Sequence, residues 1–98
     1  MAIKKETKNR LIYYEINHDE QVKLIRVSMF GNRCDSCGSK IEKVFYVPVL
    51  NWGMCEGCFR DWEQRAVRYE EDMWFSDENI RWIERVFVQV GIQLDVKC

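Results

Sequence analysis

Two Cys-x-x-Cys pairs constrain the fold of this chain more than any other feature. Cys34 and Cys37 form the first pair, and Cys55 and Cys58 form the second, with 17 residues between them. Four thiolates at about 2.3 Å close a tetrahedral Zn²⁺ site, and two short turns that each supply two sulfurs meet this geometry with little strain. The spacing therefore predicts one structural zinc ion bound by Cys34, Cys37, Cys55 and Cys58.

The rest of the composition agrees with a metal-stabilised domain. A chain of 98 residues makes one small domain, and small domains often need a staple because they bury a smaller share of their surface. The N-terminal MAIKKETKNR lacks the apolar run of a signal peptide, and no stretch approaches the roughly 20 apolar residues of a membrane span. We expect a cytoplasmic protein without membrane contact, and in that reducing compartment cysteine pairs bind metal more often than they form disulfides.

Hydrophobic patterns predict the secondary structure. We expect strands at residues 11–16, 22–30 and 43–49, the first two joined as a β-hairpin by a turn at 17–19 and the third followed by a turn at 51–53. Helical spacing begins at Glu56, and one apolar face runs through Phe59, Trp62, Ala66, Tyr69 and Met73. A second helix is expected to begin after Ser76 or Asp77 and to end at Gly91, before a short final strand over residues 92–96.

The order of these elements resembles the treble-clef zinc-finger superfamily over residues 34 to about 73. A knuckle at CDSCG is followed by a β-hairpin and by a helix that carries the second pair, CEGC. The 17-residue gap is similar in spacing to GATA-type fingers. However, VFYVPVLNWG replaces the tryptophan and arginines of that family, and EEDMWFSDE replaces its basic tail. The resemblance therefore implies the four zinc ligands and not GATA-like base reading.

The predicted fold class is a single α+β domain. We assign residues 1–33 to the N-terminal β-hairpin, residues 34–75 to the treble-clef finger, and residues 76–98 to a C-terminal helix and tail.

Other chemistry is less well supported by the sequence. Two Cys-x-x-Cys pairs also hold iron in rubredoxin-like sites, but both pairs are then followed by a small residue, whereas Phe59 follows Cys58. Four cysteine ligands leave no open position for a hydrolytic zinc site. The only histidine, His18, precedes both pairs, whereas treble-clef nucleases of the HNH type carry theirs between the metal-site elements. We therefore expect no enzymatic activity and no small-molecule substrate, and we assign no role to Cys98.

The surface is then expected to carry the function. Small treble clefs include anti-sigma factors and accessory proteins of mobile elements, so the resemblance implies a protein-binding adaptor, regulator or inhibitor, including phage or mobile-element types. Tryptophan is enriched in interface hot spots, and the candidate protein-contact residues are Trp52, Val67, Trp74 and Trp82.

The alternative is a nucleic-acid-binding accessory or transcription-regulatory finger that uses the basic half of the chain. Residues 1–60 have a net charge of +3 and residues 61–98 of −4. The candidate phosphate contacts are Lys4, Lys5, Lys8, Arg10, Arg33, Lys40, Lys43 and Arg60, with Tyr13, Tyr14 or Tyr46 to stack on bases. The acidic stretch from Glu70 to Glu78 would repel phosphate, so protein binding is favoured.

Overall fold

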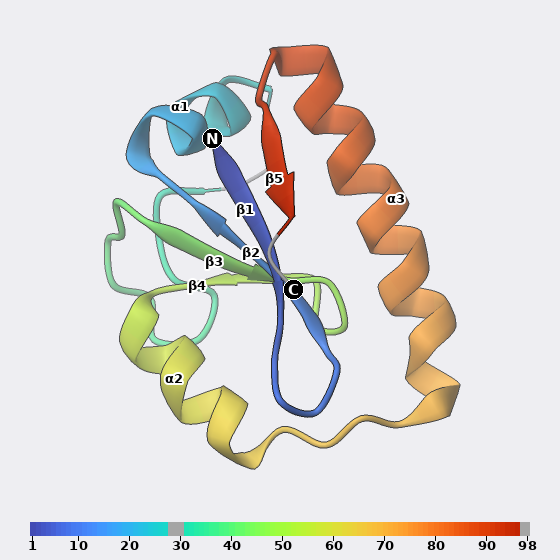
Figure 1. Ribbon diagram of the computed structural model, residues 1–98. Coiled ribbons are helices and arrows are strands. Elements are labelled where there is room, and N and C mark those ends of the chain that lie inside the picture. Colours follow the sequence, from blue (N-terminus) through green and yellow to red (C-terminus); the bar gives the residue numbers. More distant parts are fainter. Residues whose placement is uncertain (28–30, 97–98) are drawn as a thin grey trace.

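A five-stranded mixed β-sheet with helices on both faces organises the computed structural model, which describes residues 1–27 and 31–96 (Figure 1). The strand order is β4-β3-β2-β1-β5. β1 (Ala2–Glu6) pairs antiparallel with β2 (Ile12–Ile16) and parallel with β5 (Leu94–Val96). β3 (Val44–Val47) lies antiparallel between β2 and β4 (Trp52–Met54). The chain is thus a single α+β domain with an N-terminal hairpin.

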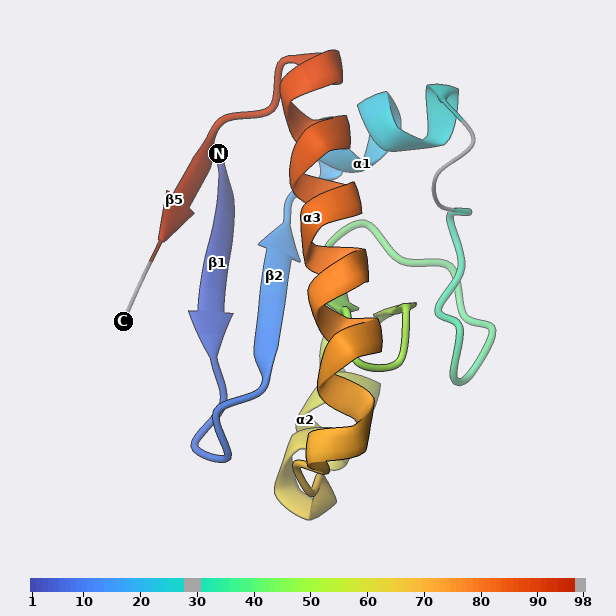
Figure 2. The same cartoon turned by 90° about the vertical axis from the view of Figure 1, so that its right-hand side faces the viewer.

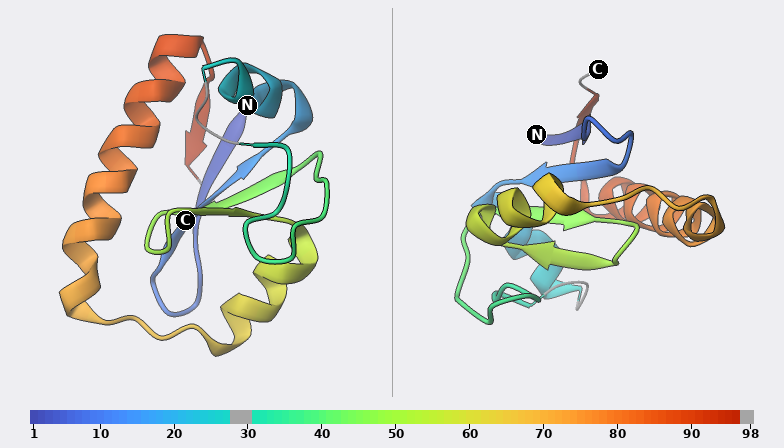
Figure 3. Two further views of the ribbon diagram at one scale, coloured as in Figure 1. Left: turned by 180° about the vertical axis from the view of Figure 1, so that it is seen from behind. Right: turned by 90° about the horizontal axis from the view of Figure 1, so that it is seen from below.

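The two longer helices lie on opposite faces of this sheet (Figures 2 and 3). Successive strand residues point to opposite faces, so Tyr13 and Tyr14 of β2 meet different helices. Phe59 of α2 (Glu56–Arg65) has its ring centroid 4.4 Å from that of Tyr13. Phe87 of α3 (Met73–Val90) lies 5.7 Å from the ring of Tyr14. Each helix therefore covers its own aromatic cluster.

The tyrosines considered for base stacking are core residues. Tyr13, Tyr14 and Tyr46 are all buried. The Tyr14 hydroxyl donates to Glu84 of α3 at 2.5 Å, and the Tyr46 hydroxyl donates to Asn51 at 2.7 Å. Burial, which disfavours the phenolate, raises the pKa of both tyrosines. None of the three is available to stack on a nucleic acid.

The N-terminal hairpin uses different strands from the predicted ones. β2 matches the expected strand at 11–16, but its hairpin partner is the preceding β1, whose charged AIKKE sequence gave no strand signal. Of the predicted second strand, residues 22–26 belong to α1 (His18–Arg26), and residues 28–30 lie outside the described residues. Asn17 and Glu20 close a capping box at the start of α1, and this local hydrogen bonding starts a helix where a turn was expected.

The first long helix is shorter than predicted. α2 ends at Arg65, Ala66 has an extended backbone, and η1 (Glu70–Asp72) leads into α3 at Met73 rather than after Ser76 or Asp77. Two hydrogen bonds from the β1–β2 turn hold the connecting segment: Asn9 donates to the Ala66 carbonyl at 2.5 Å, and Arg68 donates to the Arg10 carbonyl at 2.8 Å. These long-range bonds interrupt a helical pattern that continues in the sequence.

The remaining predicted elements are confirmed in part. β3 lies within the expected strand at 43–49 and ends just before Pro48. Of the predicted turn at 51–53, only Asn51 is in the turn, because Trp52 and Gly53 begin β4. Gly91 ends α3 in the left-handed conformation with φ 76°, and β5 follows it. Among the described residues, no helix combines the length and apolar character that crossing a membrane requires.

Candidate metal centre

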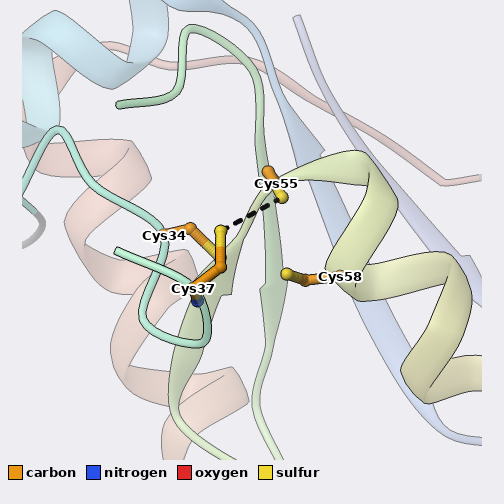
Figure 4. A group of neighbouring side chains, drawn as sticks. All are labelled: Cys34, Cys37, Cys55 and Cys58. Carbon is orange, nitrogen blue, oxygen red and sulfur yellow. Dashed lines mark hydrogen bonds between the residues drawn. The ribbon is translucent and has the colours of Figure 1, made fainter. Parts of the chain in front are cut away.

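The four cysteine side chains converge at one point between the 31–43 loop and the start of α2 (Figure 4). Their sulfur atoms all lie within 4.8 Å of one another, and the sulfurs of Cys37 and Cys55 are 3.9 Å apart. Four sulfurs at about 2.3 Å from a tetrahedral ion would be about 3.8 Å from each other. The donor set and its spacing therefore fit a metal ion with four thiolate ligands.

The first pair sits in a tight turn of the knuckle type. The Gly38 N–H donates to the Cys34 carbonyl at 2.9 Å, and the Cys34 N–H donates to the Ser39 carbonyl at 2.8 Å. This return of the chain places Gly38 in the left-handed region with φ 77°, which glycine adopts without steric cost. The N–H groups of Ser36 and Cys37 point at the Cys34 sulfur, at 3.4 and 3.5 Å.

The second pair is held by a helix. Cys55 is the N-cap of α2 with an extended backbone, and its carbonyl accepts from the Phe59 N–H at 3.0 Å. Cys58 lies in the first helical turn, one residue before the fully buried Phe59. The free N–H groups and the positive end of the helix dipole act in favour of thiolate charge at this position, while contacts with neighbouring sulfurs act against it at Cys58. Packing of Phe59 in the core thus fixes both ligands relative to the sheet.

Asp35 connects the knuckle to the edge of the sheet. Its N–H donates to the Gly53 carbonyl at 2.9 Å, and its carboxylate accepts from the Gly53 N–H at 2.8 Å. Gly53 belongs to β4, which runs directly into Cys55, so these two bonds bring the first pair alongside the second. Sequence reasoning missed Asp35 because nothing in its local pattern distinguishes it from any acidic residue in a loop.

The thiols have unequal proton affinities. Hydrogen bonds from Ser39, through its hydroxyl and its N–H, and from neighbouring thiols lower the pKa of Cys37 to about 6. Contacts with the Cys55 and Cys37 sulfurs raise the pKa of Cys58 to about 12, because its proton is shared with them. Burial acts to raise the pKa of Cys34, but N–H donors outweigh it and lower the pKa. A metal ion that deprotonates all four would release the remaining protons.

The candidate protein-contact residues are separated in the structure. Trp52 and Trp74 are exposed, while Trp82 is half-buried against Tyr46, with ring centroids 6.5 Å apart. Val67 and Trp74 are both strongly exposed, and neither belongs to α2, because that helix ends at Arg65. Val67 precedes η1 in the connection, and Trp74 follows η1 in the first turn of α3.

The basic candidates do not form one open patch. Half of them are ion-paired: Lys4 with Glu84, Lys5 and Lys43 with the buried Glu15, and Arg60 with Glu56 and Glu63. Within residues 1–27 and 31–96, the remaining four have no ion pair: Lys8 and Arg10 in the β1–β2 turn, and Arg33 and Lys40 beside the knuckle. Their positive charge is therefore divided between two places.

Comparisons of the chain with protein-family models, with curated proteins and with solved structures find no match.

Proposed function

We propose that this chain is a non-enzymatic protein-interaction module, a small adaptor, regulator or inhibitor, whose fold is stapled by one zinc ion. The observation that carries the proposal is the convergence of four cysteines from two separate elements with no other type of ligand. Such a donor set closes the coordination sphere, which is typical of structural rather than catalytic zinc. Knuckle, β3–β4 hairpin and α2 follow one another in the order of a treble clef.

The loop that carries the first pair supports a structural role for the ion. Of residues 31–43, only Cys34 and Ile41 are buried. Ordering the backbone costs about 1–2 kcal/mol per residue, whereas burying one aliphatic side chain contributes only about 1.5–3 kcal/mol. A bound ion supplies free energy that this segment does not obtain from packing.

Zinc is favoured over iron by the asymmetry of the two pairs. Only the first pair is a knuckle followed by glycine, and the second begins a helix with Phe59 after its last cysteine. A zinc ion that accepts four thiolates is redox-inert and leaves the surface to carry the activity.

Protein binding is favoured over nucleic-acid binding by the charges at the surface. Lys5, Lys43 and Arg60 neutralise neighbouring carboxylates, so they are not free to neutralise phosphates. In contrast, exposed aromatic side chains such as Trp74 are typical of protein interfaces.

The metal half of the proposal is tested by native mass spectrometry. The purified chain should carry one zinc ion, and Cys58→Ser should lose it together with most of the thermal stability. Cys98→Ser makes the same chemical change outside the four-cysteine motif and should keep the ion. Iron in place of zinc, or a folded wild type purified without metal, would contradict the proposal.

The interaction half is tested by photo-crosslinking in the native host. Benzoylphenylalanine replaces Trp52 in β4, Trp74 in the first turn of α3 or Val88 in the last turn of α3, all of which are exposed. A module that binds one protein should crosslink the same partner from one of these positions, and that partner should bind the purified chain in a saturable manner. If none of the three positions captures a protein, or if the captured ligand is nucleic acid lost at high salt, the interaction half is wrong.

A further inference from the structure

Exposed apolar side chains occur in the connection between α2 and α3 and in the first turn of α3. Val67 is 58% exposed and Trp74 is 69% exposed, and Tyr69 and Phe75 are also exposed. Trp74 packs edge-on against Phe75, with ring centroids 5.9 Å apart, so two exposed rings stabilise each other at the surface. Single exposed apolar residues are ordinary, but several within nine residues indicate an interaction site.

A groove lies next to these side chains. Its volume is about 260 Å³, and it lies between the β3–β4 turn, the end of α2 and the α2–α3 connection. The half-buried Val49, Leu50 and Trp62 give it apolar walls, while Val67 and Tyr69 contribute from the connection. Asn79 of α3 donates to the Pro48 carbonyl at 2.9 Å, which fixes the β3–β4 turn relative to α3. The groove is therefore built on fixed elements and has room for large apolar side chains.

Negative charge surrounds the same side chains. Residues 66–80 contain five carboxylates and one arginine, and Arg65, which also lines the groove, is ion-paired with Asp61. Arg68 pairs with Glu70, and Arg81 pairs with Glu78. Glu71, Asp72 and Asp77 have no ion pair within the part of the chain that the structure describes. Asp77 and Glu78 are three and four residues after Trp74, so they are its neighbours on the surface of α3.

We propose that this aromatic–acidic surface, made of Val67, Tyr69, Trp74, Phe75 and the carboxylates Glu71, Asp72 and Asp77, docks a cationic amphipathic segment of a partner protein. The inference rests on the proposed function and specifies the partner's chemistry. Apolar side chains of the segment fill the groove and cover Trp74, and its Lys or Arg side chains meet the unpaired carboxylates. Charge complementarity selects this occupant, because an acidic segment or an anionic lipid surface would be repelled.

The carboxylates also stabilise the positive end of α3, so stability and binding must be measured separately. Removing negative charge near a helix N-terminus lowers the free energy of unfolding but leaves the apolar contact area intact. Loss of binding in a variant whose unfolding transition remains cooperative then reports on the surface itself.

Fluorescence anisotropy with labelled synthetic peptides tests the proposal. The probe is a peptide of roughly 18 residues made of leucine and lysine at amphipathic helical spacing. Two controls replace lysine by glutamate or leucine by serine. The leucine–lysine peptide should bind, shift the tryptophan emission to shorter wavelength, and bind more weakly when salt rises from about 50 to about 200 mM. Equal binding of the leucine–glutamate peptide would overturn the proposal.

Variants locate the binding surface. Trp74→Ser, and separately the combined change Glu71→Gln, Asp72→Asn and Asp77→Asn, should each weaken binding of the leucine–lysine peptide by about tenfold or more. Trp52→Ser and Asp19→Asn make the same chemical changes on other elements and should change it less than about twofold. Val67→Ser provides a second variant that removes an apolar contact without adding charge if Trp74→Ser does not fold. Equal effects of the control variants would overturn the proposal.

A second copy of the chain is the competing occupant, because α1 exposes Lys23, Ile25 and Arg26. Sedimentation equilibrium should give a monomer. Self-association that both Arg26→Glu and Trp74→Ser abolish would overturn the proposal, as would Trp74-dependent binding to vesicles of phosphatidylcholine.

The docking inference and the proposed function are contradicted by different results. If the leucine–lysine peptide does not bind while crosslinking from position 52 or 88 captures a partner, the docking inference is wrong and the interaction module stands. If positions 52, 74 and 88 all capture nothing, the proposed function itself is wrong.

Discussion

Two glycines beside the metal ligands have opposite conformational requirements. Gly38 follows Cys37 with φ 77°, whereas Gly57, between Cys55 and Cys58, lies in the regular first turn of α2. An added Cβ would meet no atom within 4 Å at either site, so backbone conformation alone decides the effect. A left-handed backbone costs a residue with a Cβ about 1–2 kcal/mol, whereas alanine is preferred over glycine in a helix by about 1 kcal/mol.

We therefore expect Gly38→Ala to lower the free energy of unfolding by about 1–2 kcal/mol. Gly57→Ala, as its matched control, should raise it by about 0.4–1 kcal/mol. Urea unfolding of the metal-loaded protein measures both. A stabilising Gly38→Ala would show that the knuckle does not require the left-handed conformation.

The buried Glu15 makes the free energy of unfolding depend on pH, and the direction of this dependence follows from the shift of its pKa. Burial acts to raise the pKa of its carboxyl, but hydrogen bonds from Lys5 and Lys43 outweigh burial and hold the pKa below its ordinary value. A carboxyl with a lowered pKa binds fewer protons in the folded state than in the unfolded state. Its contribution to stability is therefore full above the unfolded pKa of about 4.3 and is lost as the pH falls through the lower folded pKa.

Glu15→Gln should be destabilised relative to the wild type at neutral pH, and this difference should shrink between about pH 5 and pH 3. Urea unfolding across this range, with metal present in both proteins, measures it. Glu42→Gln makes the same change at an exposed side chain and should show a smaller difference throughout. A wild-type advantage that is constant with pH would contradict the role of the two lysines.

At the scale of elements, α1 depends on its capping box. The Asn17 side chain accepts from the Glu20 N–H at 2.9 Å, and the Glu20 carboxylate accepts from the Asn17 N–H at 3.0 Å. Asn17→Ala removes one half of this pair and should cost about 1 kcal/mol, or about 4–8 °C in the melting temperature of a domain of this size. Asn17→Ser keeps a capping oxygen and should retain most of the stability. Equal losses in both variants would show that the cap does not stabilise the helix.

The sequence of α1 carries two competing signals, one for a strand and one for the start of a helix. The run from Val22 to Val27 is rich in β-branched residues, which favours a strand locally. The Asn-x-x-Glu signal at residues 17–20 precedes it in the sequence and was available, and it outweighs this weak propensity once Leu24 is buried by the fold.

The break between α2 and α3 could not be predicted from local sequence. Phe59, Trp62 and Ala66 continue a helical apolar face, and nothing nearby in the chain stops it. Asn9, which lies 57 residues earlier in the chain, ends the helix by donating a hydrogen bond to the Ala66 carbonyl. β1 was missed for a similar reason, because the charges of Lys4 and Lys5 are neutralised by the distant Glu84 and Glu15.

The candidate metal centre was predictable because its signal is local. Each Cys-x-x-Cys pair brings two ligands together within one turn, so only the meeting of the two turns depends on the fold. That meeting requires Asp35 and the packing of Phe59, neither of which the spacing reveals. The stop signal at Gly91 was likewise correct because it requires only one residue, whereas the start signal expected at Ser76 or Asp77 was wrong.

At the scale of the whole molecule, α2 connects the candidate metal centre to the proposed docking groove. Cys55 caps its N-terminus, and Trp62, Arg65 and Ala66 at its other end line the groove. Phe59, between them, packs on Tyr13 and Phe45 in the sheet. The opposite face of the sheet is covered by α3 through contacts that do not involve the cysteines, such as Phe87 on Tyr14. A bound ion would therefore stabilise one side of a molecule whose other side is held by apolar packing.

Chelation should consequently loosen the molecule unevenly. Segments with few buried apolar contacts open at low free-energy cost, and residues 31–43 contain only two buried side chains. On addition of a zinc chelator, we expect amide hydrogen exchange to accelerate first in residues 31–43 and in the first turn of α2. Exchange in α3 and in the β1–β2 pair should accelerate last. Mass spectrometry of proteolytic fragments measures the order, with chelated Cys98→Ser expected to behave as the wild type. Simultaneous loss of protection in α3 and in residues 31–43 would contradict this order. It would mean that the aromatic core on the α3 face does not persist without the ion. The sheet and the metal centre would then unfold as one cooperative unit.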